Sequence, residues 1–304
     1  MADTQISLMR EFTLITDVNT DVHPLYAEEQ GIVILPQYYY FEGEEIIYGD
    51  EILMDEETFY KRLANGETAK SSGVNPDRAR RTFEEELKKG KDILAIICSS
   101  GLSMSYQTCH NVGQELMQEY PGSKVIVIDS LNESSGAGLM LHVARDLQKE
   151  GKTMEEIRDH IESIKQDFQA MFVVDDLKYL VRGGRLNPFS GAFGTLLDIK
   201  PILYLNEEGK IVPLKKIRTR KRALSELLRI AKELQPDPRY LYVVYTYNRA
   251  AAEEMADRVE EELGIKVDRK YHIMMINNTI GAHTGPNVLG FGFLSKKKWS
   301  EVEI

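Results

Sequence analysis

The chain has 304 residues, which is long for a single hydrophobic core and sufficient for two domains. Hydrophobic residues make up 42% and charged residues 28%, the composition of a globular protein rather than of a disordered one. The formal net charge of −10 argues against nucleic-acid binding, because neutralising phosphates requires a concentrated basic face. The first residues lack the pattern of a secretion signal, and no window approaches the ~18 apolar residues of a membrane span. We therefore expect a cytoplasmic protein with no integral membrane segment.

The first half of the chain alternates apolar strands with amphipathic helices. Strands are predicted at residues 12–17, 32–41, 92–98 and 124–130. Helices are predicted at residues 22–30, 54–63, 77–90, 103–119, 135–150 and 152–168. Apolar strands separated by helices are typical of a parallel sheet that is covered on both faces. Residues 1–165 are therefore predicted to form an N-terminal three-layer α/β/α domain.

The second half of the chain has a different pattern. Strands are predicted at residues 170–175, 199–205, 210–217, 240–247 and 271–277. The turn signal Asn206 to Gly209 joins two of these strands, which predicts a hairpin and hence antiparallel pairing. Helices at residues 219–235 and 248–263 are expected to cover one face of this sheet. Residues 166–304 are therefore predicted to form a C-terminal two-layer α/β domain with a mixed sheet.

Polar side chains are concentrated in four loops of the first half, ITDVNTD, AKSSG, ICSSGLSMS and IDSLNESSG. Their candidate site residues are Asp17, Ser71, Ser72, Ser99, Ser100 and Ser103. Three of the loops follow strand ends, where open parallel sheets bind their ligands, and AKSSG is a connection that could fold over them. Hydroxyls and backbone amides at helix N-termini form an uncharged anion site, so a carboxylate or phosphate is the expected ligand. The alternative is that each serine only caps its own helix, as Ser103 could.

A histidine in the second half is a further candidate ligand-binding residue. His283 lies between small residues in the segment GAHTGP, which is predicted to be a turn bounded by glycine and proline. Thr284 and Gly285 follow it directly. A neutral imidazole can donate one hydrogen bond to a bound anion. The alternative is a turn histidine with no role in binding.

Two basic stretches stand out on this acidic chain. Arg182 and Arg185 flank a Gly-Gly turn in YLVRGGRLNP. Arg218 and Arg220 belong to KKIRTRKRA, which is predicted to join a strand to a helix. Clustered cations favour a phosphate group or an acidic partner protein. The alternative is a solvated helix start.

These segments, in this order, resemble motifs of the DegV family of fatty-acid-binding proteins. The similar segments are ITDVNTD, AKSSG, SSGLSMSYQ, IDS, YLVRGGR, IKPIL, IRTRKRA and GAHTGP, which span residues 15 to 286. The resemblance implies two domains with one long-chain fatty acid between them, the carboxylate at a polar mouth and the tail in an apolar tunnel. It also implies an ATP-dependent fatty acid kinase as partner, which phosphorylates the bound carboxylate, and no cofactor.

The resemblance assigns roles to individual residues of this chain. Carboxylate binding falls on Ser71, Ser72, Ser99, Ser100, Ser103 and His283. Supporting loops contain Asp17, Thr284 and Gly285. Our own candidates for docking the kinase or holding the phosphorylated product are Arg182, Arg185, Arg218 and Arg220. Met104 and Ser105 replace the Gly-Thr of the family motif. An inward Met104 would shorten the site, whereas an outward one would change little.

Two enzyme classes are alternatives to the carrier. A serine hydrolase of acyl esters would use Ser100 with His283, although no GxSxG elbow is present. A nucleotide-binding enzyme of Rossmann type would need a Gly-rich turn after the first strand, where ITDVNTD stands instead. The two cysteines, Cys98 and Cys109, supply neither a disulfide framework nor a CxxC metal site. A binder of a different lipid or of a small carboxylate is the remaining alternative.

Overall fold

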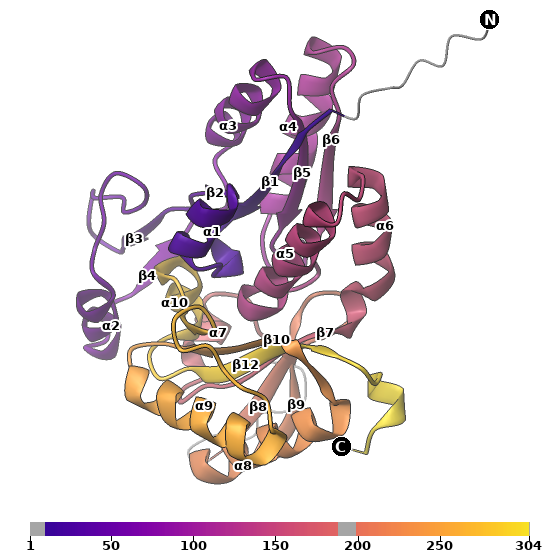
Figure 1. Cartoon of the computed structure of the whole chain (residues 1–304). Helices are drawn as coiled ribbons and strands as arrows, with labels where there is room; N and C mark the ends of the chain where they lie inside the picture. Colours follow the sequence, from indigo (N-terminus) through magenta and orange to yellow (C-terminus); the bar gives the residue numbers. More distant parts are fainter. Residues whose placement is uncertain (1–9, 188–198, 304) are drawn as a thin grey trace, which may run out of the picture.

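The computed structural model describes residues 10–187 and 199–303, and its two main β-sheets lie one above the other in Figure 1. The strands of the first half are β1 (Phe12–Asp17), β2 (Val33–Leu35), β3 (Tyr39–Phe41), β4 (Ala69–Ser71), β5 (Asp92–Ile97) and β6 (Val125–Asp129). Its helices are α1 (Pro24–Gln30), α2 (Glu56–Ala64), α3 (Pro76–Lys88), α4 (Ser105–Glu119), α5 (Ser134–Lys149) and α6 (Met154–Ile164). No helix within the described ranges is long and apolar enough to cross a bilayer.

The strands of the second half are β7 (Phe168–Val173), β8 (Lys200–Leu205), β9 (Ile211–Ile217), β10 (Pro236–Tyr245), β11 (Ile273–Met275) and β12 (Leu289–Ser295). Its helices are α7 (Lys178–Arg182), α8 (Arg220–Leu234), α9 (Arg249–Leu263) and α10 (Asn278–Thr284). Short 3-10 turns are η1 (Val18–Thr20), η2 (Lys165–Asp167) and η3 (Trp299–Glu301).

The N-terminal sheet is parallel throughout, with the strand order β2-β1-β5-β6 in the described part of the chain. Alternate residues of β5 face opposite sides of this sheet. Leu94 and Ile96 pack in one core with residues of α5 and α6, whereas Ile93 and Ile97 pack in another with residues of α3 and α4. Burial of the strands on both faces confirms the predicted α/β/α layers.

The C-terminal sheet is mixed, with the order β11-β10-β12-β7-β8-β9 among the described strands. The predicted hairpin at Asn206 to Gly209 is confirmed, since β8 and β9 pair in antiparallel fashion. Leu241 and Val243 of β10 pack with α8 and α9 on one face, whereas Tyr242 and Val244 face the core that contains α5. Helix α5 therefore lies between the two sheets (Figure 1) and belongs to the packing of both.

The predicted strand at residues 32–41 is wrong, because it is two strands. β2 ends at Leu35, and β3 begins at Tyr39 and pairs with β4 in a separate antiparallel ribbon. Pro36 lies at the break, and proline has no N–H with which to continue a sheet ladder. The break moves Gln37 to the end of the parallel sheet, where its amide donates to the carboxylate of Asp17 at 3.0 Å.

The C-terminal sheet contains a strand that the sequence analysis did not predict. β12 lies between β10 and β7, and pairs with both in antiparallel fashion. Gly290 and Gly292 interrupt its apolar pattern, and glycine is a poor strand former. A Cβ atom at position 292 would lie 2.4 Å from the hydroxyl oxygen of Ser135, so this glycine lets α5 approach the sheet closely.

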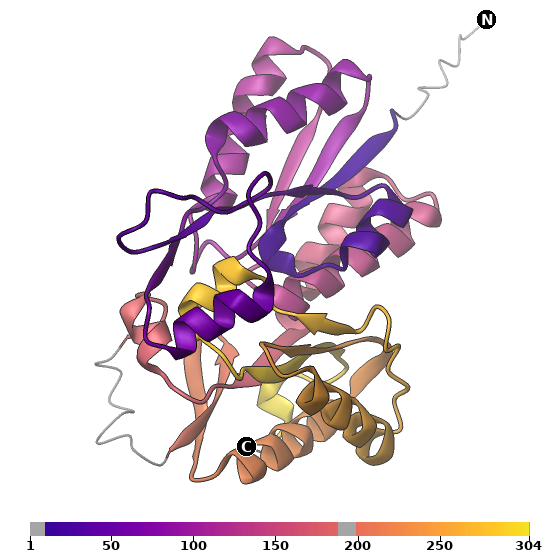
Figure 2. The same cartoon turned by 90° about the vertical axis from the view of Figure 1, so that its left-hand side faces the viewer.

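The predicted turn at GAHTGP is also wrong, because His283 and Thr284 form the last turn of helix α10. The amide oxygen of Asn277 caps this helix by accepting from the backbone N–H groups of Thr279 and Ile280. Figure 2 shows α10 beside α2, and a Cβ atom at Gly281 would lie 2.4 Å from the hydroxyl oxygen of Tyr60. This glycine allows α10 to carry His283 toward the first half of the chain.

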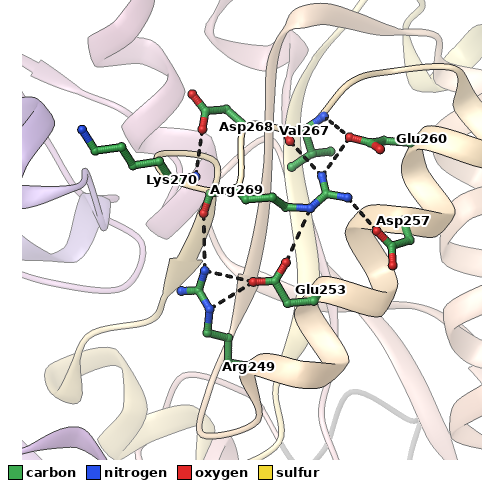
Figure 3. Close-up of polar contacts among 8 residues, drawn as sticks. All are labelled: Arg249, Glu253, Asp257, Glu260, Val267, Asp268, Arg269 and Lys270. Carbon is green, nitrogen blue, oxygen red and sulfur yellow. Dashed lines mark hydrogen bonds and ion pairs between the residues drawn. The ribbon is translucent and has the colours of Figure 1, made fainter.

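A network of charges holds the connection between α9 and β11 (Figure 3). The guanidinium group of Arg269 pairs with Asp257 at 2.7 Å, Glu260 at 2.8 Å and Glu253 at 3.5 Å. Arg249 also pairs with Glu253, at 2.9 Å. Because these three acids lie on one face of α9, Arg269 offsets their mutual repulsion and fixes the start of the segment that leads through β11 to α10.

Candidate functional site

A polar cavity lies where the ends of β1, β2 and β4 meet α7 and α10. We call it the polar chamber. Its lining residues are Asn19, Gln37, Ser71, Ser72, Gly73, Leu102, Ser103, Glu133, Leu180, Arg185, Ile211, Thr279, Ile280, His283 and Thr284. The structure thus brings together the predicted residues Ser71, Ser72, Ser103, Arg185 and His283, from segments that are far apart in the sequence.

A hydrogen bond between Ser71 and His283 lies at the centre of this group. The serine Oγ and the histidine Nε2 are 2.7 Å apart. Burial, followed by the positive charges of Arg185 and Arg182, lowers the pKa of His283 to about 4. The imidazole is therefore neutral at pH 7 and can donate through only one of its nitrogens.

The serine-rich segment after β5 is hydrogen-bonded to the segment that follows Ser71. The hydroxyl of Ser105 accepts from the backbone N–H of Val74 at 3.0 Å and is 2.9 Å from the hydroxyl of Ser103. Ser103 also accepts from the backbone N–H of Ser105 at 3.2 Å, so it serves the start of α4 as well as lining the chamber. Met104 points outward with 69% of its surface exposed, and the outward alternative therefore holds.

Arg185 adds a positive charge to a chamber that was predicted to be uncharged. Its Nε donates to the carbonyl of Leu102 at 3.1 Å, and its Nη1 donates to the carbonyl of Gly183 at 2.6 Å. These bonds hold the guanidinium group in the wall beside Ser103 and His283. A bound anion would therefore meet hydroxyl groups, a neutral imidazole and one fixed cation.

An apolar cavity adjoins the polar chamber, and we call it the apolar chamber. Its lining residues are Glu133, Ser134, Ser135, Ala170, Met171, Phe172, Leu205, Ile211, Val244, Ile276, Ile280, Thr284 and Val288. The two chambers share Glu133, Ile211, Ile280 and Thr284. The second chamber lies between α5 and the C-terminal sheet, so a polar and an apolar lining meet at these four residues.

Ser99 and Ser100 are predicted site residues that line neither chamber. The hydroxyl of Ser99 is fully buried and donates to the carbonyl of Gly209 at 2.8 Å, in the turn between β8 and β9. Ser100 is exposed, and its backbone N–H donates to the carboxylate of Asp129 at 3.1 Å. The Ser99 hydroxyl thus joins the two halves of the chain.

The alternative pair of Ser100 with His283 is not formed in the structure, where the histidine Nε2 bonds to Ser71 instead. The second ring nitrogen of His283 is buried and has no hydrogen-bond partner among the described residues. A Cβ atom at Gly183 would lie 2.2 Å from this nitrogen. No carboxylate therefore orients the imidazole in the described part of the chain, as a catalytic triad would require.

Two buried aspartates organise the loop after β1. The Oδ1 atom of Asp17 accepts from Gln37 and from the backbone N–H of Asn19, and its Oδ2 accepts from the backbone N–H of Cys98. Burial raises the pKa of Asp17 in spite of these bonds. Asp17 therefore connects the loops after β1, β2 and β5, and is not among the residues that line either chamber.

Asp21 connects the two halves of the chain. Its Oδ2 accepts from the hydroxyl of Ser134 at 2.6 Å, and its Oδ1 accepts from the backbone N–H and side-chain amide of Asn277. Burial raises the pKa of Asp21 to about 7. This carboxyl group holds the start of α5 against the segment that leads into α10.

Two of the predicted supporting residues, Thr284 and Gly285, lie at the end of α10. The hydroxyl of Thr284 donates to the carbonyl of Ile280 at 3.2 Å, and Thr284 lines both chambers. Gly285 ends the helix with a φ of 74°, and a Cβ atom there would lie 2.3 Å from Tyr179. Only glycine fits both the left-handed backbone and the adjacent ring.

The other predicted arginines lie outside both chambers. Arg182 is exposed and donates to the hydroxyl of Thr68 at 3.0 Å. Arg220 pairs with Asp175 at 2.9 Å. Arg218 lines a separate surface hollow with Lys216, Lys221, Arg222 and Arg229. Thus the basic segment after β9 forms a surface of its own.

Several polar residues of the chamber were not among the predicted site residues. Gln37, Thr279 and Glu133 line it. Gln37 and Glu133 each follow the end of a strand of the parallel sheet, a position that could have indicated them. No group of three or more His, Cys, Asp or Glu side chains in residues 10–187 and 199–303 is arranged to hold a metal ion.

The fold and the paired chambers define a two-sheet α/β protein with an amphipathic site. The chain belongs to the DegV family: the model of uncharacterised DegV family proteins matches residues 11–296. A DegV domain-containing protein of Streptococcus pyogenes is 31% identical over 281 residues, which cover 91% of this chain and 96% of that protein.

Solved DegV structures share the whole fold. A fatty-acid-binding DegV family protein from Thermus thermophilus is 28% identical, with a TM-score of 0.82 over 94% of this chain and 100% of that chain. DegV of Bacillus subtilis, a fatty acid binding protein, is 26% identical, with a TM-score of 0.78 over 94% of this chain and 100% of that chain.

Proposed function

We propose that this protein binds a single long-chain fatty acid between two domains, residues 1–165 and 166–304, and presents its carboxylate to a fatty acid kinase. The observation that carries the proposal is the junction of a polar chamber and an apolar chamber, which share four lining residues. The fatty-acid-binding DegV proteins of Thermus thermophilus and Bacillus subtilis support the same ligand class.

The carboxylate is bound in the polar chamber by Ser71 and Ser103, with Arg185 nearby. The neutral His283 donates from Nε2 to the Ser71 oxygen, which leaves the serine proton for the ligand. Each hydrogen bond to a charged group contributes roughly 1.5 to 3 kcal/mol. Two or three such bonds offset the several kcal/mol that removing a carboxylate from water costs.

The tail lies in the apolar chamber and supplies most of the affinity. Each methylene withdrawn from water contributes about 0.8 kcal/mol, so ~15 methylenes contribute on the order of 12 kcal/mol before entropy losses. The hydrogen bonds of the head contribute less than this and fix the direction in which the acid enters. Phe172, Val244 and Ile276 are among the apolar side chains that would contact the tail.

The kinase reaches the head group from the side of Ser72, which is exposed and lines the polar chamber. The exposed Arg182 lies on the same side, since it bonds to Thr68 beside β4. Arg218 and Arg220 offer a second basic surface for an acidic partner. Arg185 is assigned to the carboxylate or its phosphorylated product rather than to docking.

The test begins with the protein purified under native conditions and measured by native mass spectrometry, followed by solvent extraction of any bound molecule. We expect one fatty acid per chain. A site that stays empty after incubation with fatty acids of several lengths would reject the proposal. Exchange with a labelled fatty acid, compared between the natural protein and Ser71→Ala, then tests the head-group assignment.

The kinase step has a separate test. The loaded protein is incubated with ATP and the fatty acid kinase of the same organism, and acyl phosphate is trapped with hydroxylamine. Arg182→Ala should reduce product formation while fatty acid binding stays unchanged. Arg239→Ala is the matched control, since this exposed arginine pairs only with neighbouring Asp237 and Tyr240 in the interactions described. Equal loss in both variants would argue against docking through Arg182.

A further inference from the structure

A glutamate lies at the junction of the two chambers. Glu133 precedes the first residue of α5 and lines both the polar and the apolar chamber. Its side chain makes no capping hydrogen bond to the helix. Only 9% of the residue surface is exposed, so the carboxyl group belongs to the interior of the site and not to the surface.

The carboxyl group of Glu133 is incompletely satisfied. Its Oε2 atom is buried and has no hydrogen-bond partner among the described residues. Burial, and then the negative charges of Asp17 and Asp21, raise the pKa of Glu133 well above its ordinary value. Burial thus favours the protonated form of this carboxyl group, which can donate one hydrogen bond and accept another.

An ordinary alkyl chain would leave the Oε2 atom of Glu133 unpaired. A saturated tail that passes from one chamber to the other runs beside Glu133 and covers it with methylene groups, which neither donate nor accept hydrogen bonds. Buried polar groups without partners are costly, and a site that contains one discriminates strongly between ligands that pair with it and ligands that do not. A chain that carries a polar group at this depth would pair with Glu133 instead of leaving its Oε2 atom without a partner.

We propose that the preferred ligand is a fatty acid that carries a hydroxyl group near its carboxyl end, and that Glu133 binds this hydroxyl. The inference rests on the proposed function and adds the substrate class. The position near the carboxyl end follows because Glu133 shares the polar chamber with Ser71 and His283, where the head is bound. A ligand hydroxyl can both donate and accept, so it can pair with the buried Oε2 atom, which has no partner among the described residues.

The experiment compares hexadecanoic acid with its monohydroxy derivatives, substituted at the second, third or last carbon, by isothermal titration to the delipidated protein. We expect the second-carbon or third-carbon derivative to bind at least about tenfold more tightly than the unsubstituted acid. The derivative hydroxylated at the last carbon is the ligand control and should bind more weakly than either, since its hydroxyl would enter the apolar chamber.

Two variants assign the preference to Glu133. Glu133→Gln keeps the size and hydrogen-bonding capacity of the side chain and should keep the preference for the hydroxylated acid. Glu133→Leu should abolish the preference and bind the unsubstituted acid at least as tightly as the natural protein does. Thermal unfolding of both variants identifies a loss that is due to misfolding.

The outcomes separate this inference from the proposed function. Equal binding of plain and hydroxylated acids by the natural protein would overturn the inference and leave fatty acid binding intact. A loss of affinity for the plain acid in Glu133→Leu would show that Glu133 binds the head group instead, which also overturns it. Failure of every acid to bind would reject both proposals.

Discussion

Two of the three Ser-Ser-Gly segments of this chain, residues 71–73 and 99–101, are used differently by the fold. At the end of β4, Ser71 lines the polar chamber and bonds to His283. In the loop after β5, Ser99 turns away from both chambers and donates to Gly209 of the hairpin between β8 and β9. The first tripeptide serves binding, and the second joins the two halves of the molecule.

The difference comes from what lies beside each loop. A Cβ atom at Gly73 would first meet the hydroxyl of Ser105, at 3.2 Å, whereas one at Gly101 would meet the backbone oxygens of Glu208 and Gly209 at 2.6 and 2.8 Å. The second loop is thus pressed against main chain from the other half. A hydroxyl group at a strand end is therefore available to a ligand only where a cavity, and not packed main chain, lies beside it.

The third Ser-Ser-Gly segment lies at the start of α5, where Ser134 donates to Asp21. We expect the largest effect on stability at Asp21. The pKa of Asp21 is raised from 3.8 to about 7 in the folded protein. Between about pH 4 and pH 7 the unfolded chain loses this proton while the folded chain keeps it, so the free energy of unfolding falls as pH rises, by on the order of 4 kcal/mol.

Asp21→Asn should flatten this pH dependence, because asparagine imitates the neutral carboxyl group and tolerates the φ of 50° found here. The measurement is the urea midpoint of both proteins between pH 4 and pH 8. From pH 4 to pH 7 the natural protein should lose stability more steeply than the variant, and above pH 7 the two curves should run parallel. Curves that are parallel below pH 7 as well would mean that Asp21 is ionised in the folded state.

Gly101→Ala is expected to lower the free energy of unfolding by about 2 to 3 kcal/mol, because the added methyl group would press on main-chain atoms that cannot easily move. Gly73→Ala is the matched control from the other tripeptide and should change stability by less than about 0.5 kcal/mol. Chemical denaturation of both variants measures the difference. Similar losses would contradict the proposed contrast between the two loops.

The sequence predicted strands with continuous apolar runs better than strands whose residues are determined by long-range contacts. The apolar runs of β5, β6 and β10 indicate buried strands because local composition determines them. β12 was missed because Gly290 and Gly292 owe their place to contacts with β7 and with α5, which lie far away in the chain. Long-range packing of this kind leaves no periodic signal.

Only part of the binding site was predictable from the sequence, because the rest depends on long-range contacts. The family resemblance indicated Ser71, Ser103 and His283, which the structure brings together in the polar chamber. It also indicated Ser99, whose hydroxyl is occupied by Gly209. Glu133 was missed because a glutamate beside serines reads as a surface residue, and only its burial in the fold distinguishes it.

Ser71→Ala should weaken fatty acid binding by roughly tenfold, since it removes one hydrogen bond of about 1.5 kcal/mol to a charged head group. Ser99→Ala should leave the affinity unchanged and lower stability by about 1 kcal/mol, because its buried bond to Gly209 is lost. Titration with a fatty acid and urea denaturation of both variants measure the two effects. A loss of affinity in Ser99→Ala that equals that of Ser71→Ala would place both tripeptides at the head group.

Ser100→Ala should have the smallest effect of all. The side chain is exposed, and the interaction that anchors this residue is its backbone N–H bond to Asp129, which alanine keeps. We therefore expect stability within about 0.5 kcal/mol of the natural protein and the same affinity for fatty acids. Hydrolysis of a chromogenic acyl ester should stay at background in both proteins. Ester turnover that disappears in this variant would instead make Ser100 a nucleophile, and its loop would then have to rearrange to reach a base.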